Sequence, residues 1–177
     1  MKVGTKSLLF GVHQFLWHPW TVARAWRFIH RRWPRGWEWL AILVHDWGYW
    51  GCADIDGKEG KNHPVWSALL AERVMTFFKV PQKRITEIYE LILLHSQTTS
   101  NRVGMRPSAL CWPDKYSIVY DPPWWYLFRA RLSGELAEYR KNAVDAGQVA
   151  AFESDRSWYH WLAARNIEKT IHNALRK

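Results

Sequence analysis

The 177-residue chain lacks the features that mark secreted and membrane-spanning proteins. Its two cysteines, Cys52 and Cys111, form neither a disulfide framework nor a CxxC metal-binding pair, so a reduced, intracellular setting is expected. The apolar run from Ser7 to Val12 is too short for a signal peptide and is interrupted by His13. No stretch approaches the length needed to span a bilayer. These absences predict a soluble, cytoplasmic protein.

Acidic residues are also scarce: 16 Asp and Glu stand against 25 Lys and Arg, which gives a formal net charge of +9. Such a surplus favours an anionic partner, such as a nucleotide, a nucleic acid or acidic lipid head groups. A basic solvated surface has the same composition, so the charge alone selects no partner. A composition of 48% hydrophobic and 23% charged residues is typical of a globular domain.

The signals of β-strands, alternating polarity and hairpin turns, are absent as well. Apolar residues instead recur three and four positions apart, which is typical of helices. We therefore predict an all-α, single-domain bundle over residues 1–177, with loops at 48–61 and 96–107 and with Asn62 capping a helix. The expected helices span residues 21–33, 37–47, 62–78, 81–95, 107–120, 127 to at least 143, and 157–175.

Aromatic residues, in contrast, are abundant, and the chain has fourteen tryptophans. Core packing is the interpretation that we favour for most of them. Two alternatives remain open: some of the rings stack on bases near a functional site, or they form a belt on a membrane-facing side.

A set of histidines and aspartates lies at or beside the ends of the apolar segments. In chain order the set is His18, the pair His45-Asp46, His63, His95 and Asp114. Imidazole and carboxylate groups are ligands for divalent transition metals, and an aspartate between two ions can bridge them. Each residue alone also has a structural explanation, as a boundary histidine or a helix cap. The combination in this order favours a metal site.

This order resembles the H…HD…D pattern of the HD superfamily of metal-dependent phosphohydrolases, a family of helical bundles. His18 fits the first motif better than His13 does. The segments that carry the resemblance are His18-Pro19-Trp20-Thr21-Val22-Ala23, Leu43-Val44-His45-Asp46-Trp47-Gly48, His63-Pro64-Val65-Trp66-Ser67-Ala68, Ile92-Leu93-Leu94-His95-Ser96 and Trp112-Pro113-Asp114-Lys115-Tyr116. The resemblance implies an HD-type bundle with a motif core over about residues 18–120, completed by helices within 127–177.

The resemblance also implies a ligand set and a reaction. One metal is expected on His18, His45, Asp46 and Asp114, and a second on His63 and His95, with Asp46 bridging. The implied cofactors are one or two divalent ions of Mn, Fe, Co or Zn. Asp46, His45 and Lys115 are the implied catalytic residues. A hydroxide shared by the metals would attack the phosphorus of a small nucleotide: a nucleoside phosphate, a dinucleoside polyphosphate or a cyclic dinucleotide.

Two departures from the family pattern concern the substrate. Tyr49 stands where many members have a lysine, and Ser117 and Ile118 occupy the stretch where dinucleoside-tetraphosphate hydrolases carry a glutamate. Basic and aromatic residues near the motifs are candidates for substrate binding, although a solvated surface role is as plausible for each basic residue and core packing for the tryptophan. These candidates are Trp20, Arg24, Lys58, Lys61, Arg102 and Arg106.

Two other functions remain open at this point. The net charge of +9 and the arginine-rich segment over residues 21–33 would suit a nuclease that acts on DNA or RNA. A metal-stabilised module that binds nucleotide or membrane without catalysis is the non-enzymatic alternative.

Overall fold

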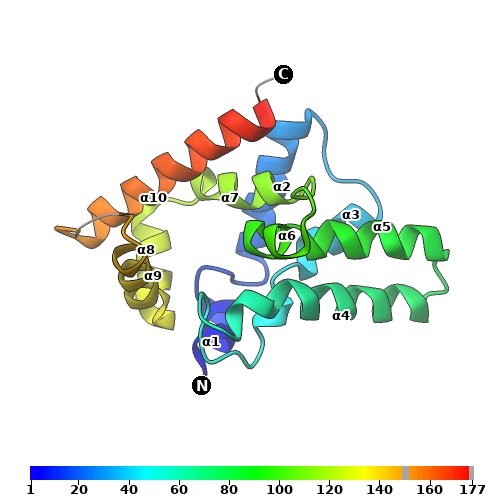
Figure 1. Cartoon of the computed structure of the whole chain (residues 1–177), viewed down its shortest axis with the longest axis horizontal. Helices are drawn as coiled ribbons and strands as arrows, with labels where there is room; N and C mark the ends of the chain where they lie inside the picture. The colour runs from blue at the N-terminus through cyan, green and yellow to red at the C-terminus, as the bar shows by residue number, and fades with distance from the viewer. Residues whose placement is uncertain (149–151, 176–177) are drawn as a thin grey trace.

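The computed structural model describes residues 1–148 and 152–175, and within these ranges the chain forms helices and no strand, as predicted (Figure 1). The α-helices are α1 (Val3–Phe10), α2 (Trp17–His30), α3 (Trp37–Val44), α4 (His63–Phe77), α5 (Gln82–Leu93), α6 (Gln97–Val103), α7 (Cys111–Tyr116), α8 (Pro123–Ser133), α9 (Glu135–Asp145) and α10 (Asp155–Thr170). Short 3₁₀ turns lie at Trp47–Tyr49, Gly60–Asn62 and Ser117–Tyr120, and a π-helical turn, Ile171–Leu175, follows α10.

Two larger apolar cores, and a small third cluster of Leu8, Tyr49 and Ile55, hold the described part of the bundle together. The first lies among α2, α3, α4 and α5, where Val22, Trp26, Ile42, Met75 and Ile92 are buried. In Figure 1, α4 and α5 run side by side as an antiparallel pair at one end of the molecule. Burial of each large apolar side chain contributes about 1.5–3 kcal/mol, so this core fixes the helices whose ends meet at the site.

The second core lies under α8, α9 and α10 and includes Tyr126, Leu127, Leu136 and Trp158. A capping box starts α10, because Ser154 and Ser157 each accept a hydrogen bond from the other's backbone N–H. Since α10 also packs against α7, this second core positions α10 beside the site.

The structure differs from several of the sequence predictions of local structure. The predicted loop over residues 96–107 contains α6, a polar helix that buries Thr99 and Ser100 and therefore has no apolar periodicity. The helix expected from residue 127 is divided at Gly134, whose φ of 91° ends α8 and precedes α9. The chain also forms α1, which was not predicted. Asn62 precedes α4, but its side chain makes no capping hydrogen bond and instead accepts one from Arg102.

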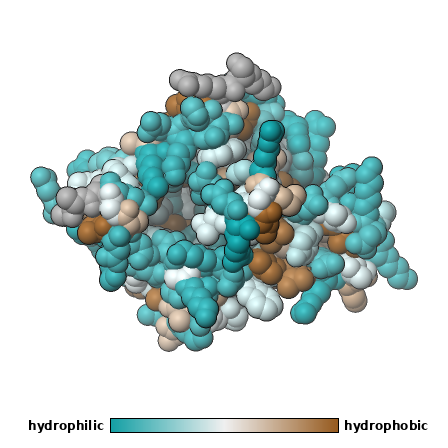
Figure 2. All heavy atoms as spheres, in the orientation of Figure 1, coloured by the Kyte–Doolittle hydropathy of each residue, from teal (hydrophilic) through white to brown (hydrophobic). Residues whose placement is uncertain are grey.

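Hydrophilic atoms cover most of the face shown in Figure 2, with smaller apolar patches between them. In the ranges that the structure describes, no helix combines the length and the apolar character that crossing a membrane requires.

Candidate metal centre

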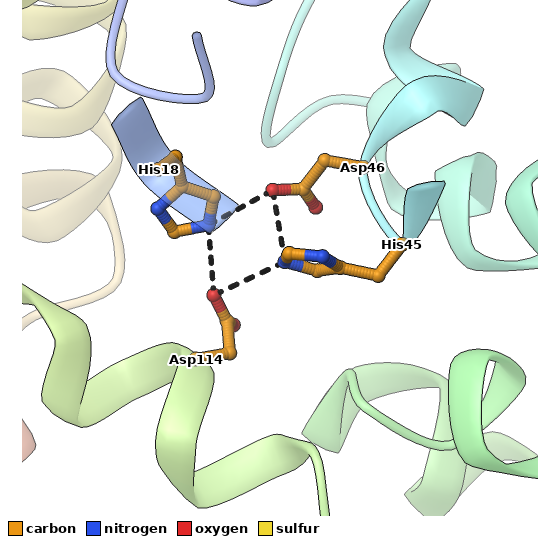
Figure 3. A group of neighbouring side chains, drawn as sticks. All are labelled: His18, His45, Asp46 and Asp114. Atoms are coloured by element: carbon orange, nitrogen blue, oxygen red, sulfur yellow. Dashed lines mark ion pairs between the residues drawn. The ribbon is translucent and has the colours of Figure 1, made fainter. Parts of the chain in front are cut away.

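The first group of predicted ligands joins side chains from three parts of the fold (Figure 3). His18 lies in the first turn of α2, His45 and Asp46 directly follow α3, and Asp114 lies in α7. His18 Nε2 is 3.1 Å from Asp46 Oδ2 and 3.2 Å from Asp114 Oδ1. His45 Nε2 is 3.2 Å from Asp46 Oδ2 and 3.6 Å from Asp114 Oδ1. Because the four ligand atoms lie within 4.8 Å of one another, they could hold one ion.

The second group shares Asp46 with the first. His63 is the first residue of α4, and His95 follows the end of α5. Asp46 Oδ1 is 3.4 Å from His63 Nε2 and 3.7 Å from His95 Nε2. Asp46 therefore directs Oδ2 to the first group and Oδ1 to the second, as a carboxylate that bridges two ions would.

Backbone carbonyls orient three of the imidazoles in the same way. His45 Nδ1 is 2.8 Å from Ile42 O, His63 Nδ1 is 2.7 Å from Gly60 O, and His95 Nδ1 is 2.6 Å from Ile92 O. A carbonyl oxygen only accepts, so each Nδ1 carries a hydrogen, and each Nε2 can bind an ion once it carries no proton. Such a hydrogen bond on the outer nitrogen is the usual support of a metal-binding histidine.

Several buried atoms at the site have no hydrogen-bond partner. His18 Nε2, His45 Nε2 and Asp46 Oδ2 lie close to one another, but none of the three atoms has a hydrogen-bond partner. His63 Nε2 and His95 Nε2 lie 3.1 Å apart, and in the neutral tautomers both of these nitrogens carry lone pairs. Unpartnered buried polar atoms cost about 1–3 kcal/mol each, a penalty that a bound cation would remove. The donor set therefore fits divalent metal ions.

The charges of the first group stabilise one another. Burial raises the pKa of Asp46, but the imidazoles of His45, His13 and His18 outweigh it and hold that pKa well below its ordinary value. Burial lowers the pKa of His45, but Asp46 and Asp114 outweigh it and raise that pKa well above 6.5. Asp46 is thus a carboxylate that needs a cation beside it, which is a proton on His45 when no metal is bound.

The second group has the opposite balance. Burial lowers the pKa of His63 to about 4, against the opposing effect of Asp46. His63 is therefore neutral at pH 7 and presents its Nε2 lone pair without first losing a proton.

Gly48 brings the two groups together. A Cβ atom at this position would lie 2.0 Å from the carbonyl oxygen of His63, so only glycine lets the segment after Asp46 approach the start of α4. Gly48 N also donates a 2.8 Å hydrogen bond to Ser67 Oγ on α4. The glycine that follows the His-Asp pair thus has a steric role: it sets the distance between Asp46 and His63.

A cavity of about 800 Å³ opens in front of both groups. Lys115, one of the implied catalytic residues, lines it, and so does Lys61 among the substrate-binding candidates. The other candidates, Trp20, Arg24, Lys58, Arg102 and Arg106, lie outside the lining.

The candidates outside the cavity have other surroundings. Trp20 is 48% exposed and stacks on Trp33 with 5.9 Å between ring centroids. The guanidinium of Arg24 lies 4.4 Å from the centre of the Tyr120 ring. Arg102 donates a 2.8 Å hydrogen bond to Asn62 Oδ1. Lys58 and Arg106 are exposed.

His13 is a cavity residue to which the sequence patterns gave no role. It belongs to neither ligand group, but it lines the cavity and meets His18 edge to face, with ring centroids 5.4 Å apart. Its Nδ1 lies 3.0 Å from Oε1 of the buried Glu135. Burial lowers the pKa of His13, but Asp46 and Glu135 outweigh it and raise the pKa to about 9. The contact joins residues 122 positions apart, so no local sequence signal reveals it.

Comparisons of the chain with protein-family models, with curated proteins and with solved structures gave no match.

Proposed function

We propose that this chain is a metal-dependent phosphohydrolase with an HD-type site that acts on a small nucleotide. One observation carries the proposal: Asp46 is shared by two groups of potential ligands, all buried except the half-buried Asp114, and directs one carboxylate oxygen to each group. The outward Nδ1 hydrogen bonds and the unpartnered Nε2 atoms support it. A single structural histidine would need neither feature.

The proposed roles of the side chains follow from where they lie. His18, His45, Asp46 and Asp114 would hold one divalent ion, and His63 and His95 a second, with Asp46 shared. Divalent ions of Mn, Fe, Co or Zn in such a site lower the pKa of water and neutralise charge on phosphate oxygens.

The cavity supplies the remaining groups. Lys115 follows Asp114 and lines the cavity, so we expect its ammonium group to contact a phosphate oxygen. Hydrolysis joins the oxygen of water to phosphorus and breaks the bond from phosphorus to the leaving oxygen, which then takes up a proton. His13 lies on the cavity wall as a hydrogen-bond donor oriented by Glu135.

The experiment that tests this function is a metal-dependent screen. Metal-free protein is loaded separately with Mn, Fe(II), Co or Zn and is incubated with nucleoside phosphates, dinucleoside polyphosphates, cyclic dinucleotides, and short DNA or RNA. We expect product release from a small nucleotide with metal, and none in chelator. If no metal supports hydrolysis of any of these, the proposal is wrong; cleavage of polynucleotides alone would make the chain a nuclease instead.

The two-metal arrangement has its own test. His63→Ala and His95→Ala are expected to lower the metal content per chain and to slow hydrolysis, because both remove a ligand of the second group. Elemental analysis of the purified variants measures the content. Unchanged metal content and rate in both variants would leave one ion, held by the first group.

A further inference from the structure

The cavity has a second wall that the ligand groups do not use, and this wall is one face of α10. The residues that α10 contributes recur at helical spacing, three, four and seven positions apart, so they share one face of the helix. From the apolar to the basic end, they are Trp158, Trp161, Leu162, Arg165, Asn166 and Lys169.

Positive charge gathers at the basic end of this wall. Lys169 lines the cavity with Arg165 and, from α7, with Lys115. Among residues 1–148 and 152–175, no carboxylate oxygen lies within 4.0 Å of the charged nitrogens of these three side chains. Burial lowers the pKa of Lys169, and the charges of Arg165 and Lys115 lower it further. Three cations that repel one another around a hollow form a site that an anion would stabilise.

An aromatic ring lies beside these cations. The guanidinium of Arg165 lies 5.2 Å from the centre of the Trp161 ring, and both side chains are partly exposed. A planar base can stack on such a pair of side chains, through the ring and through the guanidinium plane.

The order of the groups relates this wall to the metal centre. Asp114 is a ligand of the first group, Lys115 follows it in the chain, and Lys169 is close enough to Lys115 for their charges to interact. Arg165 and Trp161 come next along α10. A ligand whose reacting phosphate lies at the metal centre, beside Asp114, would therefore extend along α10 past the three cations to the Trp161 ring.

We propose that the α10 wall binds the non-reacting part of the substrate: Lys115, Arg165 and Lys169 hold a second phosphate group, and Trp161 stacks on the base. The substrate class is then a nucleotide with at least two linked phosphates. This inference rests on the proposed function for the reacting phosphate, whereas binding to α10 itself needs no metal.

Calorimetric titration of the metal-free, full-length protein in EDTA tests the wall without hydrolysis. The probes are ATP, inorganic triphosphate and adenosine. We expect ATP to bind more tightly than either half of it, because ATP engages both the cations and the ring. Arg165→Ala and Lys169→Ala should each weaken ATP and triphosphate binding about tenfold or more, since each removes a charge-assisted contact.

Variants on the same helix separate this effect from folding. Trp161→Ala should weaken ATP and adenosine but leave triphosphate unchanged. Arg156→Ala is the matched control, because Arg156 is an exposed arginine of α10 outside the cavity lining. Thermal unfolding by circular dichroism identifies any variant whose fold is lost. Equal weakening in Arg156→Ala, or unchanged ATP affinity in both Arg165→Ala and Lys169→Ala, overturns the inference.

The reaction distinguishes the failure of this inference from the failure of the proposed function. Bis(p-nitrophenyl) phosphate carries no base and no second phosphate, so Arg165→Ala should raise KM for the nucleotide by a much larger factor than KM for bis(p-nitrophenyl) phosphate. ATP binding in EDTA without hydrolysis of any probe would retain the α10 site and reject the phosphohydrolase. Metal-dependent hydrolysis without ATP binding in EDTA, and with KM unchanged in Arg165→Ala, would do the reverse.

Discussion

Asp46 and Glu135 are both buried, at 5% and 0% exposure, yet their surroundings differ in one respect. Glu135 is surrounded by hydrogen-bond donors. They are Ser7 Oγ at 2.7 Å, Val12 N at 2.8 Å, His13 Nδ1 at 3.0 Å, Tyr139 OH at 3.2 Å and Ser133 Oγ. Asp46 instead faces imidazole nitrogens, and its Oδ2 has no hydrogen-bond partner. Hydrogen bonds from the protein therefore satisfy the Glu135 carboxylate, whereas the Asp46 carboxylate needs a cation beside it.

The largest effect is expected from replacing Asp46, the carboxylate that needs a cation. Asp46→Ala should reduce the rate of hydrolysis at least about 10³-fold, because it removes the ligand that both ions share. Bound ions stabilise the charge of the transition state by several kcal/mol, and this stabilisation would be lost. It should also remove much of the bound metal while the helical circular dichroism stays near that of the wild type. Steady-state rates and elemental analysis measure the two effects.

The control for this variant is Glu87→Ala, which removes an exposed acid that is ion-paired with Arg84 and belongs to neither ligand group. Glu87→Ala should keep both the rate and the metal content. Wild-type hydrolysis by Asp46→Ala would reject the proposed site.

The second variant, Glu135→Ala, removes the carboxylate that the protein itself satisfies. The buried hydroxyl and backbone donors then have no acceptor, so we expect a loss of about 3–5 kcal/mol in the free energy of unfolding. The metal content of the folded fraction should stay the same, since Glu135 belongs to neither ligand group. Urea denaturation measures the loss, with the exposed Glu153→Ala as control; equal stability of the two variants would contradict the structural role given to Glu135.

A smaller effect, on metal affinity, sharpens the contrast between the two ligand groups. The raised pKa of His45 keeps a proton on that side chain in the metal-free protein, whereas the pKa of His63, about 4, leaves it neutral at pH 7. Metal must displace the proton from His45, so affinity of the first group should fall as the pH is lowered from about 8 to 6.

His63→Ala, which retains the first group, isolates this dependence in metal titrations at several pH values. Removing metal from the wild type with EDTA should also lower its melting temperature, because only the folded state presents the assembled ligands. A metal affinity that does not change with pH in His63→Ala would show that His45 holds no competing proton.

The same comparison explains what the sequence could reveal. The residues around Asp46 lie at helix ends beside apolar runs, and each is recognisable within a short segment, so the two groups and the all-α fold were predictable. Glu135 begins the stretch Glu135–Arg140, and a glutamate at the start of a helix is usually exposed to solvent. Its burial depends on partners such as Ser7 and Val12, more than 120 positions away, which no local pattern contains.

The α10 wall escaped prediction for a related reason. Trp161, Arg165 and Lys169 are ordinary residues for an amphipathic helix, and only the packing of α10 against α7 turns this face toward the cavity. The polar helix α6 was missed because its buried residues, Thr99 and Ser100, are hydroxylic rather than apolar.

Gly48 carries no functional group, yet the carbonyl oxygen of His63 occupies the space that any side chain there would need. Selection for the spacing between the two ligand groups would therefore act on an absent side chain. A comparison of metal sites that considers only side chains with functional groups would overlook Gly48. A redesign that transplanted the six ligands onto another helical scaffold would need to reproduce this backbone contact before it reproduced the chemistry.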